Sequence, residues 1–255
     1  MKDKAYLFGP FIGEASWEFY RFAPFAIYLK KKHPDIKLIV LTRPSRFDLY
    51  GSYADLLINL DIEDDIFEDQ KCFKSNSISI NRYYKTANMF KRKYQRLYTI
   101  EGHFYPDIKQ YRYKLKWQFT RTMMDYDFKP RKTNEKFIGK YTRSILVDLS
   151  WVEDDDFKNY LINEVNKNVS LYINYEDIMN NNTYNENVSL YGTSILLLKK
   201  MQLVIGNIKN SDITKLALLL KIPVITINEE LNEESVSLLN PFKTKITRYT
   251  YGENT

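Results

Sequence analysis

Apolar and polar positions alternate along the chain in two separate series, and each series predicts an α/β unit. The first opens with the short apolar run 5–8 and a glycine-bounded loop over 9–13. Aromatic residues then recur at helical spacing over 14–32, which predicts a helix. Pro24 lies inside this segment and predicts a kink or a break into two pieces, because proline lacks the N–H that a helix interior needs.

The next segments complete the first predicted unit. The sequence His33-Pro34-Asp35 ends the helix, and 37–42 is a continuous apolar run typical of a buried parallel strand. We expect a second helix over 53–60 and a further strand over 64–67. A strand, a helix and a second strand in this order favour a doubly wound parallel sheet.

The second series begins at Ser144 and has the same alternation. Strands are expected over 144–149, 169–173, 203–205 and 223–227, and helices over 154–164, 195–201 and 211–220. Hydroxyl and carboxylate side chains at the expected helix starts predict N-caps: Thr193 or Ser194 for one helix, and Ser211 or Asp212 for the next. Asp154, Asp155 and Asp156 fit the acidic first turn of a helix better than a metal site.

Residues 82–143, between the two series, differ in composition. They hold seventeen Lys and Arg against five Asp and Glu, with aromatic residues interleaved. Cations neutralise phosphates and aromatic rings stack on bases, so nucleic acid is one predicted partner of this stretch. The alternative is one or two amphipathic helices whose Tyr residues pack inward while Lys residues face water. A lipid-headgroup or polyanionic glycan surface is a third interpretation.

Overall composition narrows the class of protein. The chain has 255 residues, a net charge of +6, one cysteine and two histidines. These counts exclude an intramolecular disulfide framework and leave little for a histidine-based metal centre. The apolar runs are shorter than a membrane span needs, and no targeting signal is evident, so we expect a cytoplasmic protein. Its Lys-, Asn- and Ile-rich composition hints at a viral origin, in which case the compartment is the host cytoplasm.

Two stretches of the chain match the motifs of a known family. The first is Gly9-Pro10-Phe11-Ile12-Gly13-Glu14, followed by the helix and the His33-Pro34-Asp35 turn. The second runs from Gly192-Thr193-Ser194 through Leu203-Val204-Ile205-Gly206-Asn207 to Ile222-Pro223-Val224-Ile225. Together they resemble the heptosyltransferase-like glycosyltransferases of the GT-B type, and the resemblance covers about half of the residues, in the same order in both halves. Gly13-Glu14-Ala15-Ser16-Trp17-Glu18 also looks like the opening of glycosyltransferase-like proteins of phages.

The chain departs from that family at both loops. Gly13-Glu14 stands where the family has Gly-Asp, and Ile208-Lys209-Asn210-Ser211-Asp212 replaces its Asp-Ser-Gly. The resemblance implies two Rossmann-like lobes: an N-terminal acceptor lobe over 1–143, which includes the aromatic-basic, largely helical insertion 82–143, and a C-terminal nucleotide-binding lobe over 144–255.

Catalytic candidates follow from what glycosyl transfer requires. An inverting transfer needs a general base that takes the acceptor's hydroxyl proton. The resemblance implies Glu14 in this role, although an acid at this position also suits a helix N-terminus. Glu18, one turn later, is the predicted assistant. His103 is a second candidate for an acceptor-side base, with a structural role as its alternative.

Donor-binding candidates cluster at the loops that the resemblance assigns to a nucleotide diphosphate. A helix N-terminus binds phosphate through backbone N–H groups, and Lys209 would add a cation. The predicted set consists of Gly13, Ser150, Thr193, Ser194, Gly206, Asn207, Lys209, Ser211, Asp212 and Thr214.

Together these patterns predict a nucleotide-sugar-dependent glycosyltransferase that acts on a modified DNA base or another polyanionic acceptor. The donor is a co-substrate, and neither a cofactor nor a metal is expected. The competing hypothesis is a non-catalytic protein that uses a GT-B-like fold to bind nucleic acid or another partner. An epimerase-like hydrolase, which would use water in the same cleft, is a third.

Overall fold

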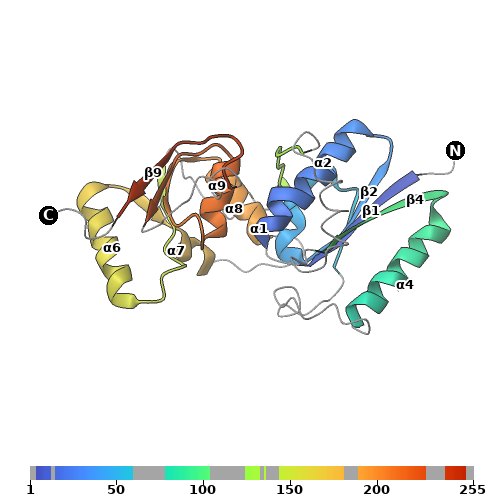
Figure 1. The fold of residues 1–255 in the computed structure, drawn as a ribbon, viewed down its shortest axis with the longest axis horizontal. Helices are drawn as coiled ribbons and strands as arrows, with labels where there is room; N and C mark the ends of the chain where they lie inside the picture. The colour runs from blue at the N-terminus through green and yellow to red at the C-terminus, as the bar shows by residue number, and fades with distance from the viewer. Residues whose placement is uncertain are drawn as a thin grey trace. The chain divides into compact units, whose positions relative to one another are not determined.

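The two predicted series fold into two parallel sheets, each in its own compact unit (Figure 1). The computed structural model describes residues 4–12, 15–59, 78–103, 124–132, 135, 144–180, 189–227 and 239–250. Unit 1 comprises Met1–Thr133 and Asn185–Gly192, and unit 2 comprises Asn134–Tyr184 and Thr193–Thr255.

Unit 1 is built on a four-stranded sheet in the order β3-β2-β1-β4, with every neighbouring pair parallel. Its strands are β1 (Lys4–Ile12), β2 (Lys37–Leu41), β3 (Leu56–Ile58) and β4 (Arg96–His103). Helix α4 (Ile78–Lys93) packs Ala87 and Phe90 against Leu7 and Leu41 of the sheet. This crossover arrangement confirms the predicted doubly wound start.

Strand β1 is longer than the apolar run predicted. It continues through Gly9 and Pro10 to Ile12, where a loop was expected. The pairing with β4 shifts register between Phe8 and Phe11, and Gly9 has a φ of 93°. Because a left-handed backbone is cheap only for glycine, Gly9 allows the irregularity while the strand goes on pairing.

The helix predicted over 14–32 is broken, as Pro24 indicated. It consists of α1 (Ala15–Trp17), the π-helical turn η1 (Glu18–Phe22) and α2 (Ala23–Lys32), which ends at His33. Pro24 lies in the first turn of α2, where a missing N–H costs little. The break therefore falls just before the proline.

The prediction of a helix over 53–60 is wrong. After β2 the chain forms two 3-10 turns, η2 (Pro44–Leu49) and η3 (Gly51–Tyr53), and then strand β3. Residues Leu56–Ile58 pair with β2, while the Asp55 carboxylate accepts hydrogen bonds from Leu38 N at 2.7 Å and Lys30 Nζ at 2.8 Å. Pairing with a distant strand thus overrides the local helical spacing.

The basic stretch 82–143 is described only in part. In α4, Phe90 is buried, whereas Lys85, Lys91, Arg92 and Lys93 are exposed. Tyr94, directly after the helix, packs on the same core as Phe90. This helix fits the amphipathic interpretation. The predicted strand over 64–67, residues 104–123 and residues 136–143 lie outside the described residues, so the insertion as a whole stays a prediction.

Residues 124–132 are fastened to the body of unit 1. Asp125 N donates to Pro24 O at 3.0 Å, and Lys31 Nζ lies 2.7 Å from the Asp125 carboxylate and 3.0 Å from that of Asp127. Phe128 is fully buried. Part of the stretch read as a binding surface is therefore structural.

Unit 2 is built on a five-stranded parallel sheet in the order β6-β5-β7-β8-β9. Its strands are β5 (Ser144–Val147), β6 (Tyr172–Asn174), β7 (Met201–Gly206), β8 (Val224–Ile227) and β9 (Ile246–Tyr249), and its helices are α6 (Asp155–Asn168), α7 (Tyr175–Asn180) and α9 (Asp212–Leu219). Helix α8 (Leu190–Leu198) begins in unit 1 and belongs to unit 2 from Thr193 onward. Figure 1 shows α6 on one side of this sheet and α9 on the other.

The N-cap predictions have mixed outcomes. Ser211 caps α9 as predicted, by accepting a hydrogen bond from Thr214 N at 3.0 Å. Asp154, which was expected in the first turn of α6, is instead its N-cap residue. The predicted start of α8 near Ile195 is wrong. The helix begins at Leu190, and Ser189 Oγ accepts from Gly192 N at 2.9 Å. Strand β9 was not predicted.

Among the described residues, no helix combines the length and the apolar character that crossing a membrane requires.

Gly51 provides a test of this fold. It has a φ of 48°, and a Cβ atom there would lie 1.9 Å from Lys129 O. We expect Gly51→Ala to lower the free energy of unfolding by roughly 2–4 kcal/mol, because the added methyl would push residues 124–132 away from η3. Urea denaturation followed by circular dichroism measures the change. The neighbouring exposed Ser52→Ala is the control, and equal midpoints for both variants would contradict the prediction.

Candidate functional site

A polar cluster forms where strands β5 and β7 end at the carboxyl edge of the unit 2 sheet. Asp148, directly after β5, is 1% exposed. Its carboxylate accepts hydrogen bonds from Ser150 Oγ at 2.6 Å, from Ser150 N at 3.2 Å and from Ser211 Oγ. A buried carboxylate thereby joins the end of β5 to the first residue before α9. We call Asp148, Ser150, Gly206, Asn207, Ser211 and Thr214 the carboxyl-edge cluster.

The loop after β7 is shaped by the Asn207 side chain. Asn207 Oδ1 accepts from Lys209 N at 3.0 Å and Asn210 N at 2.9 Å, and its Nδ2 donates to Ile227 O at 3.1 Å. These bonds tie the turn to the end of β8. Asn207 is buried, so its role is to hold the loop, whereas Lys209 is exposed.

Gly206 lets α9 approach the sheet closely. A Cβ atom at this position would lie 2.3 Å from Thr214 Oγ1 and 3.3 Å from Asp148 O. The Thr214 hydroxyl is fully buried and has no hydrogen-bond partner among the described residues. Since buried hydroxyls are ordinarily satisfied, this one is an exception at the start of α9.

Thr193 and Ser194 lie inside α8 rather than at its start. Both are 0% exposed. Ser194 Oγ is 2.8 Å from Tyr175 OH, and Thr193 Oγ1, like that of Thr214, has no partner among the described residues. Neither side chain reaches solvent.

Positively and negatively charged side chains both lie near the start of α9. Lys209 is exposed on the loop, Asp212 lies in the first helical turn, and Lys215 Nζ is 3.5 Å from Asp212 Oδ1. With Asp148 buried behind Ser211, the helix N-terminus already has a carboxylate of the protein itself nearby. An additional anion there would depend on Lys209 and the backbone N–H groups.

In unit 1, Glu18 is fully buried in the π-helical turn. Its carboxylate accepts hydrogen bonds from Tyr50 OH at 2.6 Å, from Thr42 Oγ1 at 2.9 Å and from Arg46 Nη1 at 2.9 Å. Burial and the Glu18 carboxylate raise the pKa of Tyr50 well above its usual value. Burial alone would lower the pKa of Arg46, but the facing Glu18 charge raises it. Three donors and complete burial give Glu18 a structural environment, away from any acceptor in solvent.

A second buried carboxylate in unit 1, Asp48, escaped the sequence analysis. It accepts from Arg131 N at 2.9 Å, from Arg131 Nε at 3.0 Å and from Ser189 Oγ at 2.8 Å. Asp148 and Arg46 were missed in the same way. For Asp148 the available signal was an acid directly after the apolar run of β5, because such positions fall at the carboxyl edge of a parallel sheet. Arg46 and Asp48 lie inside η2, where no strand pattern marks them.

The structure describes little of the remaining predicted site residues, Gly13, Glu14 and His103. Gly13 and Glu14 lie outside the described residues, so the base and its glycine stay predictions. His103 ends β4 opposite Ile12 of β1. Within the described ranges, no three His, Cys, Asp or Glu side chains come together as a metal site would require.

Comparison with known proteins bears on the fold. No family model and no curated protein matches the amino-acid sequence. Among solved structures, a glycosyl transferase family 9 protein from Veillonella parvula matches with a TM-score of 0.57 at 11% identity, over 98% of this chain and 87% of that one.

Two E. coli structures are also similar. The ADP-heptose LPS heptosyltransferase II has a TM-score of 0.50 at 11% identity, over 98% of this chain and 92% of that one. Heptosyltransferase WaaC with ADP-2-deoxy-2-fluoro heptose has a TM-score of 0.50 at 9% identity, over 96% and 92%. The fold is that of the GT-B glycosyltransferases. At such identities the likeness concerns architecture, and a GT-B fold by itself does not specify an activity.

The hydrogen bonds of Glu18 with Thr42, Arg46 and Tyr50 lead to a prediction about the stability of unit 1. Glu18→Gln should lower the free energy of unfolding by about 3–5 kcal/mol, because it removes the negative charge that Glu18 places beside the buried Arg46 guanidinium. Exposed Glu153→Gln is the matched control, with a change within about 0.5 kcal/mol. Urea denaturation compares them, and a Glu18→Gln midpoint equal to that of the control would refute the structural role.

The contact between Gly206 and Thr214 predicts non-additive substitutions. Gly206→Ala alone should cost roughly 1–3 kcal/mol, because its methyl would clash with the Thr214 hydroxyl. Adding Thr214→Ala should restore much of that loss, since the remaining Cβ atoms would be in ordinary contact. A double-mutant cycle of unfolding free energies measures the coupling. Strict additivity would show that the close approach does not limit this position.

Proposed function

We propose that this protein is a glycosyltransferase that uses a nucleotide-activated sugar as its donor. The observation that carries the proposal is the GT-B fold, shared with glycosyltransferase structures over 96–98% of the chain. One of those structures, WaaC, is a complex with an ADP-linked sugar. The carboxyl-edge cluster supports the proposal, because ligands of open parallel sheets bind beyond the carboxyl ends of the strands.

The donor diphosphate would bind at the start of α9. Its oxygens would accept hydrogen bonds from backbone N–H groups of the loop and the first helical turn, and the exposed Lys209 ammonium would balance their charge. Ser211 and Asn207 already serve the protein's own backbone and the Asp148 carboxylate. Their proposed part is to hold the loop in shape.

The transfer itself would need a base in unit 1, and we assign it to Glu14. The Glu14 carboxylate would take the proton of the acceptor hydroxyl as that oxygen bonds to the anomeric carbon, and the nucleoside diphosphate would leave with the electrons of the broken bond. Glu18, four residues later and fixed by three donors, would position this turn rather than accept a proton. The reaction proposed in this way uses no metal.

For the acceptor we propose a polyanion, such as DNA carrying a modified base. The exposed cations Lys85, Lys91, Arg92 and Lys93 on α4 support this choice, as does the exposed Arg96 at the start of β4. These five side chains are exposed on α4 and on the strand that follows it, and a group of exposed cations attracts the phosphates of a polyanion.

One observation favours a second candidate, a non-catalytic polyanion-binding protein. Asp148 and Asp212 place two carboxylates close to the α9 N-terminus, which weakens its attraction for a diphosphate. A protein of this kind would retain the basic face of α4 and would lack donor binding.

Donor binding is the decisive test. In a thermal-shift series with UDP-, GDP-, ADP- and CMP-linked sugars, one donor should raise the melting temperature. At a hundred times its dissociation constant, a ligand adds about 2.7 kcal/mol of stability. Lys209→Met should reduce the shift, whereas Lys200→Met, an exposed lysine before the amino end of β7, should leave it unchanged.

Turnover separates the two candidates further. Glu14→Gln should keep the thermal shift and lose sugar transfer, measured as release of the nucleoside diphosphate. If no nucleotide sugar shifts the melting temperature while DNA binds with a steep salt dependence, the non-catalytic candidate replaces the transferase.

A further inference from the structure

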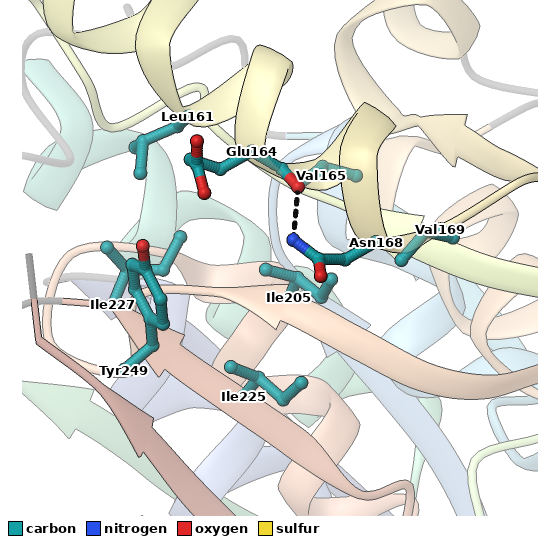
Figure 2. A pocket seen from close by; sticks show the side chains of 9 residues that line it. All are labelled: Leu161, Glu164, Val165, Asn168, Val169, Ile205, Ile225, Ile227 and Tyr249. Atoms are coloured by element: carbon teal, nitrogen blue, oxygen red, sulfur yellow. Dashed lines mark hydrogen bonds between the residues drawn. The ribbon is translucent and has the colours of Figure 1, made fainter. Parts of the chain in front are cut away.

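Unit 2 contains a pocket that the proposed transfer does not use. It has a volume of about 450 Å³ and lies between α6 and strands β7, β8 and β9 (Figure 2). Ile205, Ile225 and Ile227 line it from the sheet, and Leu161 and Val165 line it from the helix. Its size falls within the range of pockets that hold small molecules.

The pocket lies on the side of the sheet that faces α6. Ile205, Ile227, Leu161 and Val165 belong to the hydrophobic cluster between α6 and the sheet. Helix α9, where the donor would bind, contacts the sheet from the other side (Figure 1). A ligand in this pocket would therefore not occupy the proposed donor site.

Three polar groups interrupt the apolar lining: the Glu164 carboxylate, the Asn168 amide and the Tyr249 hydroxyl. Glu164 Oε1 accepts from Lys167 Nζ at 2.6 Å, and Asn168 Nδ2 donates to Glu164 O at 2.8 Å. Among the described residues, Glu164 Oε2, Asn168 Oδ1 and the Tyr249 hydroxyl have no hydrogen bond. Two acceptors and a phenol thus remain for a ligand.

These groups select the charge of the ligand. An anion would meet the Glu164 carboxylate, and a wholly apolar molecule would cover that carboxylate without giving it a partner, which is unfavourable. A protonated amine satisfies both acceptors. The Lys167 ammonium already neighbours Glu164, but its side chain is 68% exposed, so this ion pair is solvated and weak enough for a ligand amine to compete.

We propose that this pocket binds a small apolar amine: a hydrocarbon or aromatic body among the isoleucines, with an ammonium group at Glu164 and Asn168. Figure 2 shows the Glu164 side chain reaching over the pocket on the side where the Tyr249 hydroxyl lies. The site is independent of the proposed transferase activity.

Matched probes test the charge requirement. Calorimetric titration with 4-phenylbutylamine, 4-phenylbutanol and 4-phenylbutyrate compares one apolar body with three head groups. We expect the amine to bind about tenfold more tightly than the alcohol, because a hydrogen bond to a charged group strengthens binding by roughly that factor. The acid should bind most weakly of the three. Equal affinity for the three probes, or no binding of the amine at millimolar concentration, would overturn the proposal.

Variants locate the binding. Glu164→Gln should reduce amine affinity to that of the alcohol and leave alcohol binding unchanged, while exposed Glu153→Gln alters neither. Lys167→Met should tighten amine binding by removing the competing ammonium. Ile225→Trp should block all three probes by filling the pocket, with circular dichroism verifying its fold. Amine binding that persists unchanged in Glu164→Gln and in folded Ile225→Trp would place the amine elsewhere and refute the site.

Discussion

The structure depends on how it satisfies three buried carboxylates: Glu18, Asp48 and Asp148. Glu18 lies in the π-helical turn η1, Asp48 lies in the 3-10 turn η2 and Asp148 follows β5 directly, and each is at most 1% exposed. A charge out of water is costly unless donors surround it, so each carboxylate requires partners from distant segments. Glu18 joins the π-helical turn to η2, Asp48 joins η2 to residue 131 and Ser189, and Asp148 joins β5 to α9. The loops that would carry function are held by these contacts.

This arrangement has a consequence for the chemistry of unit 2. Ser211 and Asn207 are the residues that most suggest phosphate binding, but their side chains form hydrogen bonds within the protein itself. What the site offers a ligand is therefore the backbone of a well-fixed loop and the exposed Lys209. Such a site is preorganised but close to electrically balanced, and this is why the GT-B fold alone leaves both a transferase and a binding protein as candidates.

The two faces of the unit 2 sheet are chemically different. On the α9 side, glycine at 206 and the buried Thr214 allow close packing, whereas on the α6 side the isoleucines surround a pocket with a carboxylate at Glu164. Alternate residues of one strand serve opposite faces, so Val204 and Ile205 belong to different environments. One sheet can therefore support a donor loop and a separate apolar site.

Local patterns in the sequence determined the order of most strands and helices, the break before Pro24, the acidic start of α6 and the Ser211 cap. These features depend on neighbouring residues, such as a missing N–H or a hydroxyl three residues before its donor. Only the tertiary structure decided the extension of β1, the strand at Leu56–Ile58 and the partners of the buried carboxylates. Ser211 and Asp148 are 63 positions apart, and Arg131 and Asp48 are 83 apart. Contacts over such separations leave no periodic pattern in the sequence, because they form only when the tertiary fold brings distant segments together.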